Sequence, residues 1–209
     1  MPGDPVSEDE PVVGLVACGV GGLDSVRESF VVPALERGWR VAVTLTPTAG
    51  RWLTASGEVA RLARATGLPV RVDPRSPGER SPHPPVSCYV VAPASANTVA
   101  KLALGIADNQ ALTTVGEALG NRATPVVVFP RVNAAHARHP AWDGHLAALR
   151  RAGVHLIHGP EVWELHEPRQ ASPGRALPWS AVLTATARAL HHPISAEGPQ
   201  ADDPRAPAT

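Results

Sequence analysis

Small polar side chains stand where an apolar segment of the chain gives way to a helical one. The apolar segment ends at Ala92, and Ser95, Asn97 and Thr98 follow it closely. They offer two hydroxyl groups and an amide, and the start of the helix adds backbone N–H groups without partners inside the helix. An anion such as a phosphate suits this combination, because a helix N-terminus also favours negative charge. The sequence therefore predicts an anionic ligand in this loop.

Three more loops follow expected strands and could contribute to the same site. They occupy residues 18–22, 46–49 and 130–133. In an open α/β sheet the carboxyl ends of the parallel strands lie at one edge, and ligands bind there. We therefore expect the four loops to enclose a single ligand.

The glycine-rich first loop lacks a complete dinucleotide-binding fingerprint. Gly19 and Gly21 supply the first two glycines of G-x-G-x-x-G, but Asp24 stands where the third would fall. The second expected strand ends in Thr46 rather than in an acid that could bind a ribose hydroxyl. The chain also contains no G-x-x-x-x-G-K-[ST] segment. These observations disfavour NAD and a nucleoside triphosphatase.

Short apolar segments alternate with helical patterns along the chain, and these elements must position the loops. The expected strands cover 12–17, 40–45, 70–72, 88–92, 125–129 and 155–157. The expected helices cover 24–37, a start at about 49, 56–66, the Ser95 loop to about 104, 113–119, 142–152 and 179–190. The alternation predicts an α/β fold with a single domain: a Rossmann-like (flavodoxin-like), doubly wound parallel sheet with right-handed crossovers. Residues 130–140 are expected to form an irregular loop.

Composition narrows the class of protein further. The 209 residues include 19 Lys or Arg and 19 Asp or Glu, so no basic face is predicted and nucleic acid is not an expected partner. No apolar run approaches the roughly 18–20 residues that cross a bilayer, and the first residues lack signal-peptide features. We expect a cytoplasmic protein without membrane contact. The two cysteines, Cys18 and Cys88, lack metal-site spacing, so no metal is expected.

The polar loop and the residues after it resemble the homo-oligomeric flavin-containing cysteine decarboxylases. This family includes phosphopantothenoylcysteine decarboxylase and the epidermin-type peptidyl-cysteine decarboxylases. Residues 93–98 read PASANT, and residues 105–109 match the family's GxxDN segment. Residues 19–22 resemble its first flavin loop. Residues 46–52 resemble its T-x-x-A-x-x-F segment, with tryptophan in place of phenylalanine.

A further segment, residues 130–140, resembles the family's P-x-M-N-x-x-M-W-x-x-P. Both prolines and Asn133 are kept, while Val132, His136 and Ala137 replace the two methionines and the tryptophan. The resemblance covers residues 12 to 190. It assigns residues 12–191 to a flavoprotein domain, between a disordered lead (1–11) and a disordered tail (192–209).

The resemblance implies that the ligand is FMN, bound where the subunits of a homo-oligomer meet, in a trimer or a dodecamer of trimers. It points to a set of flavin contacts, with Arg131 reaching the flavin by its backbone: Gly19, Gly21, Thr46, Ser95, Ala96, Asn97, Thr98 and Arg131.

The family's chemistry implies roles for three more residues. Oxidation of a cysteine at Cβ precedes loss of CO2 and gives an enethiol. His83 is the only histidine before the PASANT loop, so it is the candidate catalytic base or orienting group. Asn133 is expected to hold the substrate carboxylate and to take part in catalysis. His136, in place of a methionine, is expected to contact the substrate.

No cysteine follows Cys88, although the phosphopantothenoylcysteine enzymes use a late cysteine to reduce the enethiol. The sequence therefore predicts oxidative decarboxylation of a peptide that ends in cysteine, in the biosynthesis of a ribosomal peptide natural product. Two alternatives stay open: a phosphopantothenoylcysteine-type decarboxylase, and a flavin-binding protein of other activity, such as a flavin prenyltransferase-like protein. Residues 158–178 stand in the place of the family's substrate clamp and are expected to form a mobile flap.

Overall fold

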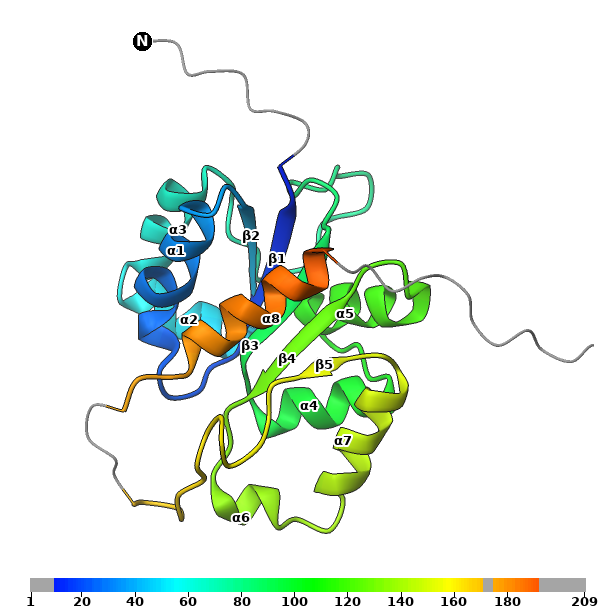
Figure 1. Cartoon of the computed structure of the whole chain (residues 1–209). Coiled ribbons are helices and arrows are strands. Elements are labelled where there is room, and N and C mark those ends of the chain that lie inside the picture. Colours follow the sequence, from blue (N-terminus) through cyan, green and yellow to red (C-terminus); the bar gives the residue numbers. More distant parts are fainter. Residues whose placement is uncertain (1–9, 171–174, 192–209) are drawn as a thin grey trace, which may run out of the picture.

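Five parallel strands form the sheet, in the order β2-β1-β3-β4-β5 (Figure 1). The computed structural model describes residues 10–170 and 175–191. The expected tail, most of the expected lead and residues 171–174 of the expected flap lie outside this range. The strands are β1 (Val12–Ala17), β2 (Arg40–Leu45), β3 (Cys88–Ala94), β4 (Val126–Pro130) and β5 (His155–Leu156). This all-parallel sheet confirms the predicted fold class.

The central strands are buried on both faces, which explains their continuous apolar sequences. Every residue of β1 is buried, and Val13 pairs with Val41 of β2 on one side and Cys88 of β3 on the other. The ladder between β3 and β4 is interrupted after Val91 and resumes at Ala94, which lies opposite Pro130. This register places the loops that follow β3 and β4 side by side.

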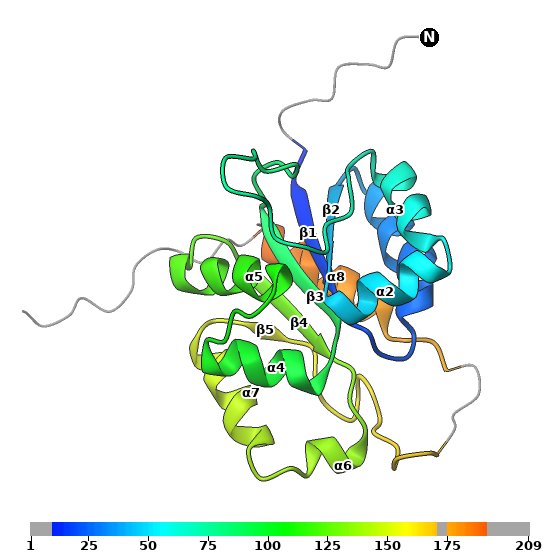
Figure 2. The ribbon, with the colours of Figure 1, turned by 180° about the vertical axis from the view of Figure 1, so that it is seen from behind.

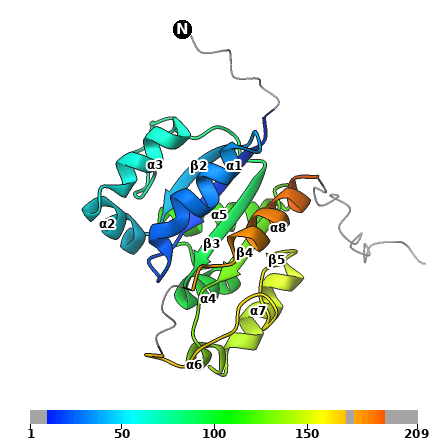
Figure 3. The ribbon, with the colours of Figure 1, turned by 60° about the vertical axis from the view of Figure 1, so that its left-hand side comes forward.

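Helices cover both faces of the sheet (Figures 2 and 3). One face packs against residues 23–35, here called the first helical segment, and against α3 and α8. The other face packs against α4, α5 and α7. The helices are η1 (Leu23–Ser25), η2 (Arg27–Val31), α1 (Val32–Leu35), α2 (Pro47–Ala55), α3 (Glu58–Thr66), α4 (Ala96–Leu104), α5 (Gln110–Asn121), α6 (Ala134–Ala137), α7 (Trp142–Arg151) and α8 (Trp179–His191). No helix of the described chain has the length and apolar character needed to cross a bilayer.

The structure differs from the sequence-based expectation in three local details. Residues 70–72 form no strand, because only Arg71 pairs with β2, through hydrogen bonds with Val43 and Leu45. The helix expected over 24–37 is built of a 3-10 turn, a π turn and a short α-helix, and Pro33 in the last of these has no N–H to donate. The loop expected over 130–140 contains the short helix α6.

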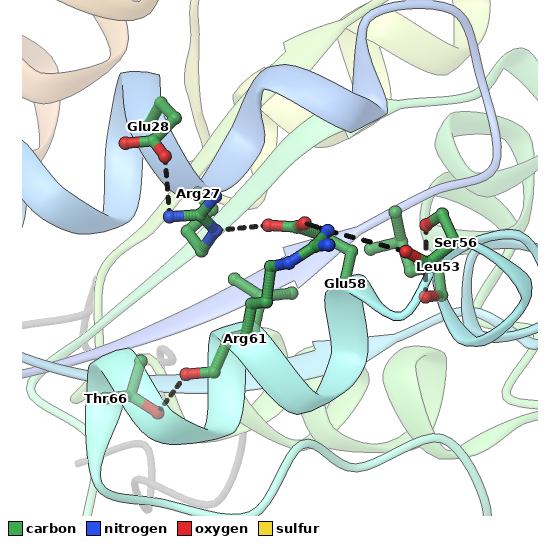
Figure 4. A network of polar contacts seen from close by, with 8 residues as sticks. Arg27, Glu28, Leu53, Ser56, Glu58, Arg61 and Thr66 are labelled. Carbon is green, nitrogen blue, oxygen red and sulfur yellow. Dashed lines mark hydrogen bonds and ion pairs between the residues drawn. The ribbon is translucent and has the colours of Figure 1, made fainter.

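A cluster of ionic contacts fixes α3 to the first helical segment (Figure 4). Glu58 opens α3 and is only 8% exposed, and its carboxylate binds Arg27 and Arg61. Burial alone would raise the pKa of Glu58, but the hydrogen bonds from Arg61 and Arg27 outweigh it and lower the pKa. Glu28 holds the other side of the Arg27 guanidinium at 2.6 Å. This cluster supports the sheet face opposite α4 and α5.

Candidate cofactor and substrate site

The polar loop after β3 is ordered by its own side chains. Ser95 caps α4, because its hydroxyl accepts a hydrogen bond from the N–H of Thr98 at 3.1 Å. The same hydroxyl donates to the Thr98 hydroxyl at 3.0 Å, and the Cys18 thiol donates to that oxygen at 3.2 Å. Thr98 is 3% exposed. Thr98 therefore joins the end of β1 to the start of α4. Burial raises the pKa of the Cys18 thiol, so this thiol stays protonated and can donate the bond.

A cavity of about 420 Å³ lies at the carboxyl edge of the sheet, beside this loop. It is lined by Gly19, Thr46, Pro47, Thr48, Ser95, Asn97, Thr98, Lys101, Asp108 and Asn109. The N-cap residues of α2, α4 and α5, which are Thr46, Ser95 and Asn109, are all in this set, so three helix N-termini meet at the cavity. Each carries a partial positive charge and unsatisfied N–H groups. Its one carboxylate, Asp108, is paired with Lys101. The cavity therefore favours an anion.

The first loop can approach this cavity because it contains glycine. A Cβ at Gly19 would lie 2.5 Å from Cγ2 of Thr48, so a larger residue would push the loop away from α2. Gly22 has a φ of +89°, and a Cβ there would lie 2.7 Å from Cδ1 of Leu177. Beside Gly21 there is more room, and the Arg131 Nη2 atom lies 3.7 Å from the Cβ position. The first loop thus separates the Thr48 side of the edge from the Arg131 side.

A second cavity, of about 250 Å³, lies on the Arg131 side. It is lined by Arg131, Val132, Asn133, Trp163, His166, Glu167, Pro168, Arg169, Gln170 and Arg175. The Arg131 N–H donates to the Ala94 carbonyl at 2.8 Å, which ties this loop to the end of β3. The Asn133 Oδ1 atom accepts from the His136 N–H at 2.9 Å and caps α6. Its Nδ2 group is therefore the part of Asn133 that can donate to a ligand.

The expected catalytic histidine, His83, lies in a different part of the structure from these two cavities. His83 lines a third cavity, of about 230 Å³, together with Thr44, Tyr89 and residues of α5, and this cavity shares no lining residue with the other two. The His83 Nε2 atom lies 2.7 Å from the Pro69 carbonyl, which can only accept, so Nε2 carries the proton. Burial lowers the pKa of His83, the Pro69 bond opposes this, and the charge of Arg71 lowers it further.

The structure thus gathers most of the expected cofactor residues and separates the expected catalytic ones. Gly19, Thr46, Ser95, Asn97 and Thr98 line the first cavity, and Ala96 begins α4 between two of them. Gly21 lines neither cavity, Arg131 lines the second with Asn133, and His136 is exposed on α6 and lines neither. The four loops therefore enclose two neighbouring cavities rather than one ligand site.

Sequence reasoning missed two groups at these cavities. Lys101 lies one turn into α4 and reaches the first cavity, as its position four residues after Asn97 allows. Trp163 and Arg175 come from the segment after β5, which has no regular structure and so offered no periodic signal. The available signal for this part of the site was the presence of basic and aromatic residues in the segment that follows β5.

Fold and site together define a class: a parallel α/β protein with a polar cavity, lined by helix N-termini, at the carboxyl edge of its sheet. Within this class, the Flavoprotein family model matches residues 7–191. The chain belongs to the Flavoprotein family.

Solved structures with a similar fold include TvaF and MrsD. TvaF, described as an FMN-dependent cysteine decarboxylase from thioviridamide biosynthesis, is 26% identical with a TM-score of 0.63, over 87% of this chain and 98% of TvaF. MrsD from a Bacillus species is 22% identical with a TM-score of 0.61, over 87% of this chain and 96% of MrsD, and this likeness shows the fold alone.

A curated relative matches a shorter stretch. A cysteine/cysteine sulfinic acid decarboxylase from an unknown prokaryotic organism is 41% identical over 69 residues, which are 33% of this chain. The match spans 18% of that relative's length.

Proposed function

We propose that the chain binds FMN in the first cavity and oxidatively decarboxylates the C-terminal cysteine of a peptide to an aminoenethiol, in the biosynthesis of a ribosomal peptide natural product. The observation that carries this proposal is the convergence of three helix N-termini on one cavity, in a chain 26% identical to TvaF. The PASANT segment supplies one of the three helix starts.

The residues of the first cavity fit the phosphate of FMN. The phosphate needs hydrogen-bond donors and positive potential, and α2, α4 and α5 supply both without a lysine dedicated to it. The hydroxyl of Thr46 makes no capping bond to α2, and Asn97 is exposed on the first turn of α4, so both can donate to a ligand. Ser95 and Thr98 hold the loop in shape, and Gly19 lets the first loop close over it.

In the proposed reaction this chain holds the substrate and moves its proton. When bound, FMN supplies the two-electron oxidation of the cysteine side chain that allows the carboxylate to leave as CO2. The amide of Asn133 donates to that carboxylate from the second cavity. Arg131 lies between the two cavities, because its side chain approaches Gly21 and also lines the second cavity. In this proposal the substrate in the second cavity and the cofactor in the first cavity lie on opposite sides of the first loop, close to Gly21.

His83 lines a separate cavity, so we infer that it serves the substrate held by a neighbouring subunit. Its Nε2 proton is engaged by Pro69, which leaves the unprotonated Nδ1 atom as the basic site. Among the described residues, three large apolar side chains are exposed: Trp52 of α2, and Leu104 and Ile106 around the end of α4. Exposed apolar side chains are expected on a surface that packs in an assembly. A trimer, or a dodecamer of trimers, would complete the site.

The test uses the purified full chain, FMN and a peptide that ends in cysteine. We expect bound flavin absorbance and a peptide product lighter by about 46 Da, the mass of CO2 and two hydrogen atoms. Loss of about 44 Da from phosphopantothenoylcysteine instead would assign the phosphopantothenoylcysteine-type reaction, because CO2 alone then leaves. Bound flavin without turnover of either would assign a flavin-binding protein of other activity. A chain that fails to bind FMN at all would refute the proposal.

A further inference from the structure

In the second cavity, two arginine side chains make cation–π contacts with the same aromatic ring. The guanidinium carbons of Arg175 and Arg131 lie 3.9 and 5.2 Å from the centroid of the Trp163 ring. Trp163 is 7% exposed, and Phe129 of β4 packs against it edge-on with the ring centroids 6.2 Å apart. The ring is therefore fixed by the core and orients both guanidinium groups toward the cavity.

The positive charge of this cavity is not neutralised by the described residues around it. Glu167 is the one carboxylate in its lining, and both of its oxygens bind Arg138, at 2.6 and 2.9 Å. Arg175 donates to the Glu164 carbonyl oxygen at 2.7 Å, which carries no net charge. The buried Nε atom of Arg131 has no hydrogen-bond partner among the described residues. Arg169 adds a third guanidinium to the lining.

This excess of charge identifies an anion site and not a packing feature. Burial and the neighbouring charge of Arg175 lower the pKa of Arg131, as expected for a partly buried cation held close to another cation. The four residues between Gln170 and Arg175 are Ala, Ser, Pro and Gly, so the sequence supplies no countercharge there. A bound anion would provide it.

The carboxylate that leaves as CO2 is a poor partner for this pair of arginines. That group loses its negative charge in the transition state, so a guanidinium bound to it would stabilise the ground state more and slow the reaction. The neutral amide of Asn133 avoids this effect. Arginine suits an anion that keeps its charge throughout the reaction, and its binding energy can then position the reacting end of the substrate.

We propose that the arginines of the second cavity bind an acidic side chain of the substrate peptide, one or two positions before the terminal cysteine. This inference rests on the proposed function and names its substrate class. Arg131 and Asn133 are two residues apart in one loop and line the same cavity. We therefore expect the two anions of the substrate to lie within about 7 Å of each other along the peptide, which is the span of two extended residues.

The experiment compares peptides that carry aspartate at the first or second position before the cysteine with their asparagine counterparts. Dissociation constants are measured by calorimetry, and kcat/KM by mass spectrometry. We expect at least one aspartate peptide to bind roughly tenfold to a hundredfold more tightly than its counterpart, the range of a charge-assisted hydrogen bond. Arg175→Gln should remove most of this preference, and Arg175→Lys should keep part of it. Arg64→Gln, which removes an exposed charge of α3, is the matched control and should keep all of it.

Calorimetry separates failure of this inference from failure of the proposed function. Equal binding of aspartate and asparagine peptides overturns the inference, and decarboxylation of either still supports the proposed function. An aspartate preference that Arg175→Gln leaves intact also overturns it, as does peptide binding too weak to detect. Tight binding of phosphopantothenoylcysteine that depends on Arg175, without an aspartate preference, assigns the arginines to a phosphate and refutes the peptide carboxylate.

Discussion

Replacement of Asn97 by alanine tests the cofactor cavity without disturbing the fold. Asn97 is the second residue of α4, is exposed, and makes no side-chain hydrogen bond to another described residue. Alanine also has the higher helix propensity. The free energy of unfolding of the apoprotein should therefore change by less than about 0.5 kcal/mol, as for surface substitutions that break no contact.

The effect on FMN binding should be much larger. A hydrogen bond to a charged phosphate contributes about 1.5–3 kcal/mol, so its loss should weaken FMN binding about tenfold to a hundredfold. Ser95→Ala provides the contrast, because it removes the cap of α4 and the bond to Thr98. This second variant should lose about 1–2 kcal/mol of stability as well as cofactor affinity.

The assay titrates apoprotein with FMN and follows the quenching of flavin fluorescence, while urea unfolding measures stability. Asn121→Ala, at the exposed end of α5, is the matched control and should bind FMN like the parent chain. If Asn97→Ala binds FMN as tightly as the control, the start of α4 does not hold the phosphate, and the reasoning about the three helix N-termini fails.

Three other predictions concern catalysis and stability. His83→Ala should keep FMN affinity within about twofold and lose turnover, because His83 lines neither cavity of the site; retained turnover would exclude it as the base. Glu58→Gln should cost about 1–3 kcal/mol in urea unfolding, because two arginines lose a nearly buried carboxylate; an unchanged midpoint would contradict this. Burial lowers the pKa values of His83 and His158 in the folded chain. As the pH falls, the unfolded chain therefore binds protons before the folded chain does, and the free energy of unfolding should decrease below about pH 6.5. His158→Gln should flatten that slope, and an unaltered slope would rule out His158 as a cause.

The sheet could be predicted because its strands are buried runs of valine and leucine that end in recognisable loops. Ser95 also signalled the start of α4, since it caps that helix through its own side chain. The helix expected over 113–119 begins earlier, at Gln110, because the Asn109 side chain caps it. Residues 70–72 have a strand-like composition but form only a bridge at the edge, because pairing depends on where the chain turns next and not on propensity alone.

The loops that line the first cavity could be predicted for a similar reason, because each is a local motif fixed by its strand and helix. The second cavity could not, because Trp163 and Arg175 reach Arg131 through an irregular segment whose path depends on tertiary packing. The separation of His83 from Asn133 was also invisible, since sequence order does not reveal which cavity a loop residue faces.

An early and a late segment of the chain meet beside the first loop. Leu177 packs against Gly22, and the indole N–H of Trp179 donates to the Ser25 hydroxyl at 3.0 Å, across 154 positions of sequence. A ribosome makes Gly22 and Ser25 early and α8 late, so the glycine loop lacks its packing partner during most of synthesis. The nascent chain can therefore complete the packing around the first loop only after α8 has emerged from the ribosome.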